Sequence, residues 1–152
     1  MNISPTDLKR VVVFQNATND DLQLILQNSI TRSIEEGGFF FFQGDPAQFL
    51  YVLTSGQAKL MQTSSTGQQV SLRMLYPWQM FGALGAVRTE ATYPASAQAL
   101  ENSTALASKA STEIVREKGQ EISITFTVPN KDGLLEYYDS VGNHVKLGLR
   151  CS

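Results

Sequence analysis

Few residues in this chain could catalyse a reaction or hold a metal ion. It contains one histidine, His144, and one cysteine, Cys151. A structural zinc site needs four ligands of these types, a disulfide needs two cysteines, and a cysteine-ligated iron–sulfur cluster needs several. A Ser-His-Asp triad would have to use His144, and no Gly-x-Ser-x-Gly motif accompanies it. We therefore expect no metal, no other cofactor and no enzymatic activity.

The charge balance gives no drive toward phosphate-rich partners. The chain has 12 Lys and Arg side chains and 14 Asp and Glu side chains, for a formal charge of −2, and it has no run of five basic residues. Such a balance does not attract nucleic-acid backbones or anionic membranes. We expect no direct nucleic-acid binding by this chain alone.

The ends and the composition indicate a cytoplasmic location. The first ten residues, MNISPTDLKR, lack the apolar stretch of a signal peptide. No apolar run reaches the roughly 18 residues that a membrane-spanning helix needs. A single cysteine also suits a reducing compartment. We expect a cytoplasmic protein that does not enter the membrane.

The elements that must position any site are mostly short strands. Of the 152 residues, 42% are hydrophobic and 17% are charged, which is enough to bury a core. Helical periodicity predicts a helix over 19–28 and a shorter one before it, around Leu8, Val11 and Val12. Short apolar or alternating runs then recur every 8 to 12 residues or so. These runs predict strands at 39–42, 49–53, 58–61, 70–75, 95–100 and 105–107.

This pattern favours a mainly β fold. The segment Ser64 to Gly67 has the composition of a hairpin turn between two of the predicted strands. Seven or eight short strands between such turns are typical of a double-sheet jelly roll, also called a double-stranded β-helix, or of a small barrel. The short helices would flank it.

The last part of the chain reads differently. A weak helical period predicts a helix from Ser111 to Lys118, with Ser111 and Thr112 as caps rather than nucleophiles and Gly119 as its C-cap. We place a domain boundary there, between residues 1–118 and an atypical strand-rich tail, residues 119–152. The alternation at 122–128 predicts a strand, and Gly142-Asn143 could turn a further hairpin.

Several turn motifs occur in an order that resembles a known family. They are Gly37, Gln43-Gly44-Asp45-Pro46-Ala47, Leu50-Tyr51-Val52-Leu53, Ser55-Gly56, Thr66-Gly67, Leu75-Tyr76-Pro77, Phe81-Gly82 and Tyr93-Pro94-Ala95-Ser96-Ala97-Gln98-Ala99-Leu100. Together they resemble the cyclic-nucleotide-binding domain of the Crp/Fnr (catabolite activator) transcription regulators, over roughly residues 8 to 118. The resemblance implies a cupin-like jelly roll that takes part in signal transduction and transcription regulation.

The resemblance also implies a ligand site, but two of its charged positions are changed. In the family, the ligand phosphate lies against the short helix after Phe-Gly, a following Glu receives the ribose 2′-hydroxyl, and an Arg-Ser or Arg-Thr pair neutralises the phosphate. Here the Glu position is Ala83, and the pair is Tyr93-Pro94. Losing a charged contact to a buried phosphate costs about 2 to 5 kcal/mol. Tight cAMP binding is therefore not expected. Trp78-Gln79 also replaces the usual Gly-Asp, which predicts a bulkier turn.

Three interpretations of the altered pocket remain open. Tyr93 and Leu84 could fill it, leaving a scaffold without a ligand. A different small anion, such as a 2-oxo acid, could bind the backbone amides of the Phe-Gly segment together with Arg88, unless Arg88 lies on a solvated loop beside Glu90. Weak cyclic-nucleotide binding through backbone amides is the third. The candidate ligand-binding residues are Phe81, Gly82, Ala83, Leu84, Arg88, Tyr93, Pro94 and Ala95.

The predicted function is that of a non-enzymatic regulatory or sensor domain whose ligand biases the segment after the barrel. In the family that segment is a long helix followed by a helix-turn-helix, which we do not find in residues 119–152. The tail would instead pair with a sheet edge of its own barrel or of a neighbour's. The other explanation is that it replaces the DNA-binding domain of a truncated or frame-shifted regulator. The alternative is a ligand-free interaction or dimerisation module. In either case we expect a homodimer.

Overall fold

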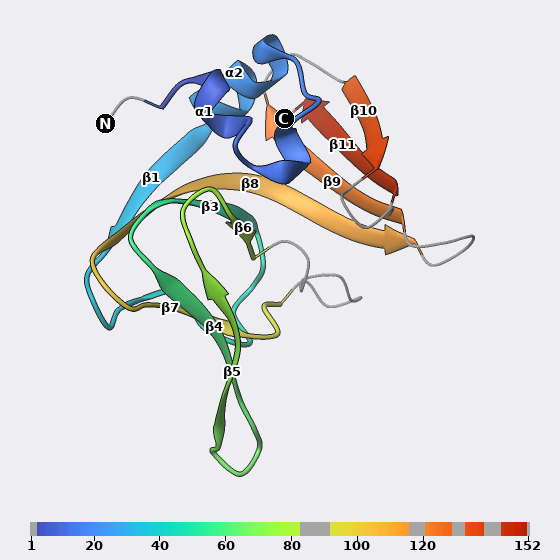
Figure 1. Cartoon of the computed structure of the whole chain (residues 1–152). Helices are drawn as coiled ribbons and strands as arrows, with labels where there is room; N and C mark the ends of the chain where they lie inside the picture. The colour runs from blue at the N-terminus through green and yellow to red at the C-terminus, as the bar shows by residue number, and fades with distance from the viewer. Residues whose placement is uncertain (1–2, 83–91, 116–120, 129–132, 139–143, 152) are drawn as a thin grey trace.

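Among the residues that the structure describes, the helices lie in the first part of the chain and strands form most of the rest (Figure 1). The computed structural model describes residues 3–82, 92–115, 121–128, 133–138 and 144–151, and the side chains of residues 3–82 and 92–109. Its helices are α1 (Pro5–Leu8), the 3-10 turn η1 (Val12–Phe14) and α2 (Asn19–Gln27). Its strands are β1 (Ser29–Ile34), β2 (Phe39–Phe41), β3 (Phe49–Ser55), β4 (Ala58–Thr63), β5 (Gln69–Leu75), β6 (Met80–Phe81), β7 (Ser96–Ala99), β8 (Ser103–Val115), β9 (Glu121–Val128), β10 (Gly133–Tyr138) and β11 (His144–Cys151).

The strands form two sheets, as expected for a jelly roll. One has the order β10-β11-β9-β8-β3-β6, with β1 also paired to β8, and the other has the order β2-β7-β4-β5. All pairs are antiparallel except β9 with β11. The mainly β prediction is confirmed, and each strand predicted within residues 39–107 is present. β1 and β6 are too short or too polar to be recognised from alternation.

β8 is the strand that joins the barrel to the tail. Its first half pairs with β1 on one side and β3 on the other, and residues 110–115 pair with β9. The helix predicted from Ser111 to Lys118 is therefore wrong over residues 111–115, and residues 116–118 lie outside the described part. Thr112, Ile114 and Val115 are β-branched and favour a strand, and pairing with β9 outweighs the weak helical period.

The tail contributes three strands to the same sheet. The strand predicted at 122–128 is confirmed as β9, and β10 and β11 form the antiparallel pair predicted around Gly142-Asn143, whose turn lies outside the described residues. β9 pairs with β8 of its own chain, one of the two arrangements that the sequence left open. The sheet thus runs across the proposed boundary at residue 119.

β3 separates two apolar clusters because its side chains alternate between the faces of its sheet. Leu50 and Val52 face the helices, and Tyr51 and Leu53 face the barrel interior. The helix cluster consists of Leu8, Val11, Phe14, Ala17, Leu22, Ile25, Leu50, Val52 and Leu106. The interior cluster consists of Phe40, Phe41, Tyr51, Leu53, Ala58, Leu75, Phe81, Tyr93, Ala97, Ala99, Ala105 and Ala107.

The turn between β5 and β6 holds a tryptophan in a backbone conformation that usually requires glycine. Trp78 has φ +67°, and no other non-glycine residue among those described has a positive φ. Its backbone N–H donates to Leu53 O at 2.6 Å. Its ring packs on the helix cluster, and the Arg10 guanidinium lies 5.2 Å from the ring centroid. Packing and a cation–π contact offset a strain of about 1 to 3 kcal/mol.

Two substitutions of Trp78 separate the contribution of its ring contacts from the cost of its strained backbone. We expect Trp78→Ala to lower the free energy of unfolding by about 2 kcal/mol, because the ring contacts are lost while the strained φ remains. Trp78→Gly removes the same ring but relieves the strain, so it should be about 1 kcal/mol more stable than the Ala variant. Urea unfolding measures both. An Ala variant as stable as the Gly variant would contradict the strain.

Candidate functional site

Three of the predicted site residues converge on one aromatic ring, that of Phe41. Phe81 ends β6, is buried, and lies 6.1 Å from Phe41 between ring centroids. Gly82 follows with φ +85°, and a Cβ built there would lie 3.3 Å from ring atoms of both Phe41 and Tyr51. A side chain at Gly82 would therefore be strained and would push against the interior cluster.

Tyr93 is the third residue, and it points into the barrel. Its ring stacks on Phe41 with centroids 3.8 Å apart, and it is 4% exposed. Its hydroxyl donates to Phe49 O at 2.7 Å and accepts from Phe49 N at 3.3 Å. Burial raises the pKa of this phenol to about 12, although the bond to the Phe49 backbone works in the opposite direction. A neutral phenol thus lies where the resemblance places a phosphate-binding arginine.

The chain around Tyr93 is held by the turn between β2 and β3. Tyr93 O accepts from Gly44 N at 2.8 Å, and Tyr93 N donates to Asp45 O at 2.9 Å. Pro46 and Thr92 form an isolated bridge beside them. The turn itself is closed by Asp45, whose carboxylate accepts from Phe42 N at 3.0 Å. Two motifs that are far apart in the sequence are thus fixed against each other.

Two of the remaining candidates, Pro94 and Ala95, directly follow Tyr93 in the chain. Ala95 is buried, and Pro94 is exposed with its carbonyl bound by the Gln62 side chain at 2.9 Å. Ala83, Leu84 and Arg88 lie outside the described residues, so the predicted roles of these three remain predictions. Among the described residues no group of His, Cys, Asp and Glu could hold a metal ion, and no helix is long and apolar enough to cross a membrane.

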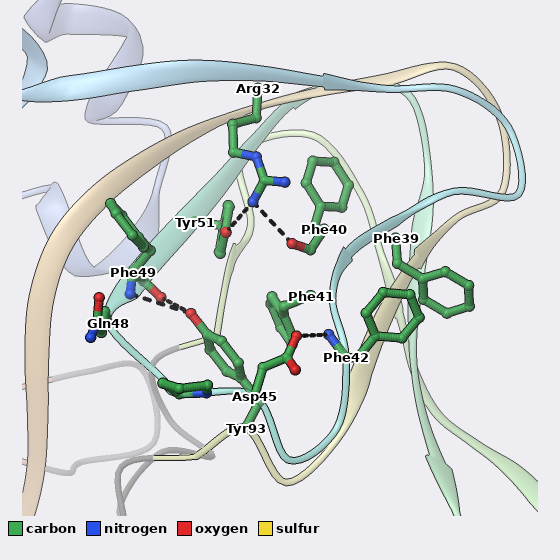
Figure 2. A pocket seen from close by; sticks show the side chains of 11 residues that line it. Arg32, Phe39, Phe40, Phe41, Phe42, Asp45, Gln48, Phe49, Tyr51 and Tyr93 are labelled. Atoms are coloured by element: carbon green, nitrogen blue, oxygen red, sulfur yellow. Dashed lines mark hydrogen bonds between the residues drawn. The ribbon is translucent and has the colours of Figure 1, made fainter.

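A cavity of about 470 Å³ lies beside Tyr93 (Figure 2). We call it the aromatic cavity, because seven of its lining residues carry phenyl or phenol rings, most of them on β2, β3 and the segment between them. It is lined by Arg32, Phe39, Phe40, Phe41, Phe42, Asp45, Pro46, Gln48, Phe49, Tyr51 and Tyr93. Its size is that of a pocket for one small molecule. Of the five predicted site residues that the structure describes, Tyr93 alone lines it.

Among the described residues of this lining, Arg32 supplies the basic side chain, and nothing in the sequence pattern singles it out. It lies on β1, whose residues are all exposed or half-buried. Its Nη1 donates to Tyr51 Oη at 2.6 Å and to Phe40 O at 3.0 Å, and its guanidinium carbon lies 5.7 Å from the Tyr51 ring centroid. A cation thus enters the cavity from the face opposite to Asp45 (Figure 2).

The Tyr93 hydroxyl can be tested without a ligand. Tyr93→Phe leaves the backbone N–H and C=O of Phe49 without their side-chain partner, so we expect the free energy of unfolding to fall by about 1 to 2 kcal/mol. Tyr76→Phe, at a half-exposed tyrosine, should change it by less than about 0.5 kcal/mol.

The wild type and Tyr93→Phe also provide a test of the pH dependence of stability. The Tyr93 pKa is raised from 10.0 to about 12 in the folded state, so the wild type should keep its advantage over Tyr93→Phe below pH 10 and lose it as the pH rises toward 12. An advantage that grows with pH in this range would contradict the buried neutral phenol.

Comparison with known proteins gives a consistent family assignment. Residues 31–112, more than half of the chain, match the cyclic nucleotide-binding domain model. The Cyclic AMP receptor protein of Thermus thermophilus is 32% identical over 100 residues, which are 66% of this chain and 46% of that protein. The Transcriptional activator protein anr of Pseudomonas aeruginosa is 36% identical over 73 residues, 48% of this chain and 29% of that protein. The chain thus spans less than half the length of these relatives.

Solved structures agree with the sequence relatives. The sensor domain of the transcriptional regulator DNR from Pseudomonas aeruginosa superposes with a TM-score of 0.62 at 27% identity, covering 67% of this chain and 68% of that one. The Catabolite Activator Protein of Thermus thermophilus gives a TM-score of 0.56 at 33% identity, covering 62% of this chain and 44% of that one. This chain belongs to the cyclic nucleotide-binding domain family, among the regulators of the Crp/Fnr type.

Proposed function

We propose that this domain is a cytoplasmic, non-enzymatic sensor whose altered pocket binds a small non-nucleotide anion in place of a cyclic nucleotide. The observation that carries the proposal is Tyr93. A buried neutral phenol, bound to the Phe49 backbone, stands where the resemblance places the arginine that neutralises a nucleotide phosphate. A phosphodiester placed against Tyr93 would meet a neutral hydroxyl that is already bound to the Phe49 backbone, instead of the cation that the resemblance implies.

The fold offers a route by which an occupied pocket could act on the rest of the chain. Phe49, which binds the Tyr93 hydroxyl, lies opposite Lys109 in the register of β3 and β8. Directly after Lys109, β8 leaves β3 and pairs with β9. A ligand that favours one arrangement of Phe49 and Tyr93 would therefore bias the point where the barrel joins the tail, by no more than its difference in affinity for the two arrangements.

Transcription regulation enters the proposal through the relatives, which are named as regulators. Direct nucleic-acid binding by residues 1–152 is not part of it, because the net charge of −2 includes no basic run. We propose that the domain acts through the segment that follows β8 or through a partner chain.

A thermal-shift experiment tests the exclusion of nucleotides. We expect cAMP and cGMP, each at millimolar concentration, to leave the melting temperature of this protein unchanged. They should raise that of the Cyclic AMP receptor protein of Thermus thermophilus, the positive control. At about 100 times its Kd, a true ligand stabilises by about 2.7 kcal/mol, which is a shift of several degrees.

The same screen includes carboxylates, with 2-oxoglutarate and pyruvate among them. At least one non-nucleotide anion should raise the melting temperature of this protein. A shift with cAMP as large as that of the control protein would contradict the proposal, and so would the lack of a shift with any anion.

A second candidate function, homodimerisation, is supported by the surface of β5. This strand is an edge of the four-stranded sheet, and its hairpin with β4 projects beyond the barrel (Figure 1). Val70, Leu72 and Met74 are 53%, 50% and 38% exposed at alternate positions of that edge. An unpaired edge with an apolar stripe is a surface on which a second copy of the strand can pair.

Light scattering tests this candidate. The wild type should have twice the 16.7 kDa mass of one chain, and Leu72→Lys should have the mass of one chain, because a lysine at the edge opposes strand pairing. Val12→Lys, at an apolar residue that is 49% exposed on the helical side, is the control and should remain dimeric. A wild type that stays monomeric at high concentration, or a dimeric Leu72→Lys, would contradict dimerisation through β5.

A further inference from the structure

Arg32 has binding capacity that the fold does not use. Among the described residues, its guanidinium forms hydrogen bonds only through Nη1, to a phenol and a backbone carbonyl, and no carboxylate forms an ion pair with it. Both acceptors are neutral, so they orient the guanidinium but do not neutralise its positive charge. A half-buried guanidinium held in this way can still bind a carboxylate through its other N–H groups.

Aromatic rings stand beside this charge in the pocket lining. Phe40, Phe41 and Tyr51 are buried and pack as one aromatic group, with Phe40 and Tyr51 5.8 Å apart and Phe41 and Tyr51 5.5 Å apart between ring centroids. At the outer side, Phe39 and Phe42 stack at 4.5 Å, and Phe42 is 54% exposed. These rings favour a ligand body that is itself apolar, and flat enough to lie among them.

Asp45 limits how many negative charges the ligand can carry. Its carboxylate lies on the opposite side of the aromatic cavity from Arg32, where it closes the turn by accepting from Phe42 N (Figure 2). A second anionic group on the ligand would face this exposed carboxylate, and like charges in one pocket repel each other. A ligand with one anionic end, directed at Arg32, avoids that repulsion.

We propose that the aromatic cavity binds a monocarboxylate with an aromatic or otherwise apolar body, and that Arg32 binds its carboxylate. This assignment rests on the proposed sensor function and names the ligand class of the same region. Tyr51 positions the guanidinium through the hydrogen bond to Nη1. The cation that recognises the anion thus comes from β1 rather than from the segment that contains Tyr93.

The ligand class is tested on the full chain by calorimetric titration with three probes. 3-Phenylpropanoate carries one carboxylate, 3-phenylpropanamide has the same body without charge, and phenylsuccinate carries a second carboxylate. We expect 3-phenylpropanoate to bind at least ten times more tightly than the amide and than the dicarboxylate. Equal affinities for the acid and the amide would overturn the role of the charge, and tighter binding of phenylsuccinate would overturn the limit to one anionic group.

Variants locate the binding residue. Arg32→Met should weaken 3-phenylpropanoate binding at least tenfold and leave the affinity for 3-phenylpropanamide unchanged. Arg32→Gln keeps a donor for Phe40 O, and it should have the same two effects if the Met variant does not fold. Arg73→Met removes an equal charge from β5, where Arg73 donates to Met80 O at 3.0 Å, and should leave binding unchanged. Wild-type affinity in both folded Arg32 variants would overturn the assignment.

These outcomes separate this inference from the sensor function. If 2-oxoglutarate or pyruvate stabilises the protein and 3-phenylpropanoate does not bind, the ligand class assigned here is wrong and the sensor function stands. If no anion binds at all, both are wrong.

Discussion

The phenol of Tyr93 and the backbone of Phe49 form the contact on which the barrel end depends. Both polar backbone groups of Phe49 are bound by one hydroxyl, and the ring that carries this hydroxyl stacks on Phe41. The segment before β7 is thereby fixed to the start of β3. Rotation of the Tyr93 side chain would leave its buried hydroxyl without hydrogen-bond partners, which costs free energy. The Tyr93 ring therefore occupies the barrel interior at this point, and the aromatic cavity lies beside it.

Much of the fold follows from patterns that a sequence displays. Residues 49–53 of β3 form an uninterrupted apolar run because the strand is buried on both faces, and the alternation of its side chains divides the helix cluster from the interior cluster. The helix over residues 111–118 could not be judged correctly from a local period, because β8 is continued by its pairing with β9, a contact that is not local. β6 has only two residues, too few for any periodicity.

The candidate site was predictable in part. Turn glycines and the Phe-Gly pair mark the family, and Gly82 is where a side chain would meet Phe41 and Tyr51. The inward position of Tyr93 follows from its size and its place before a buried strand. Arg32 could not be found in this way, because its role depends on which strand lies opposite Tyr51 and Phe40 in space, and a lone arginine in a polar strand looks like any solvated residue.

We propose that the cation that binds a ligand is Arg32 on β1, and not a residue at the Tyr93 position, where the resemblance places an arginine. The measurement that tests this most directly is an NMR titration that follows the Arg32 Nε–H and the Gly82 amide. With 3-phenylpropanoate, we predict that the Arg32 signal shifts and saturates, while cAMP at the same concentration moves neither signal. Saturating shifts of the Gly82 amide with cAMP, with Arg32 unaffected by the carboxylate, would contradict it.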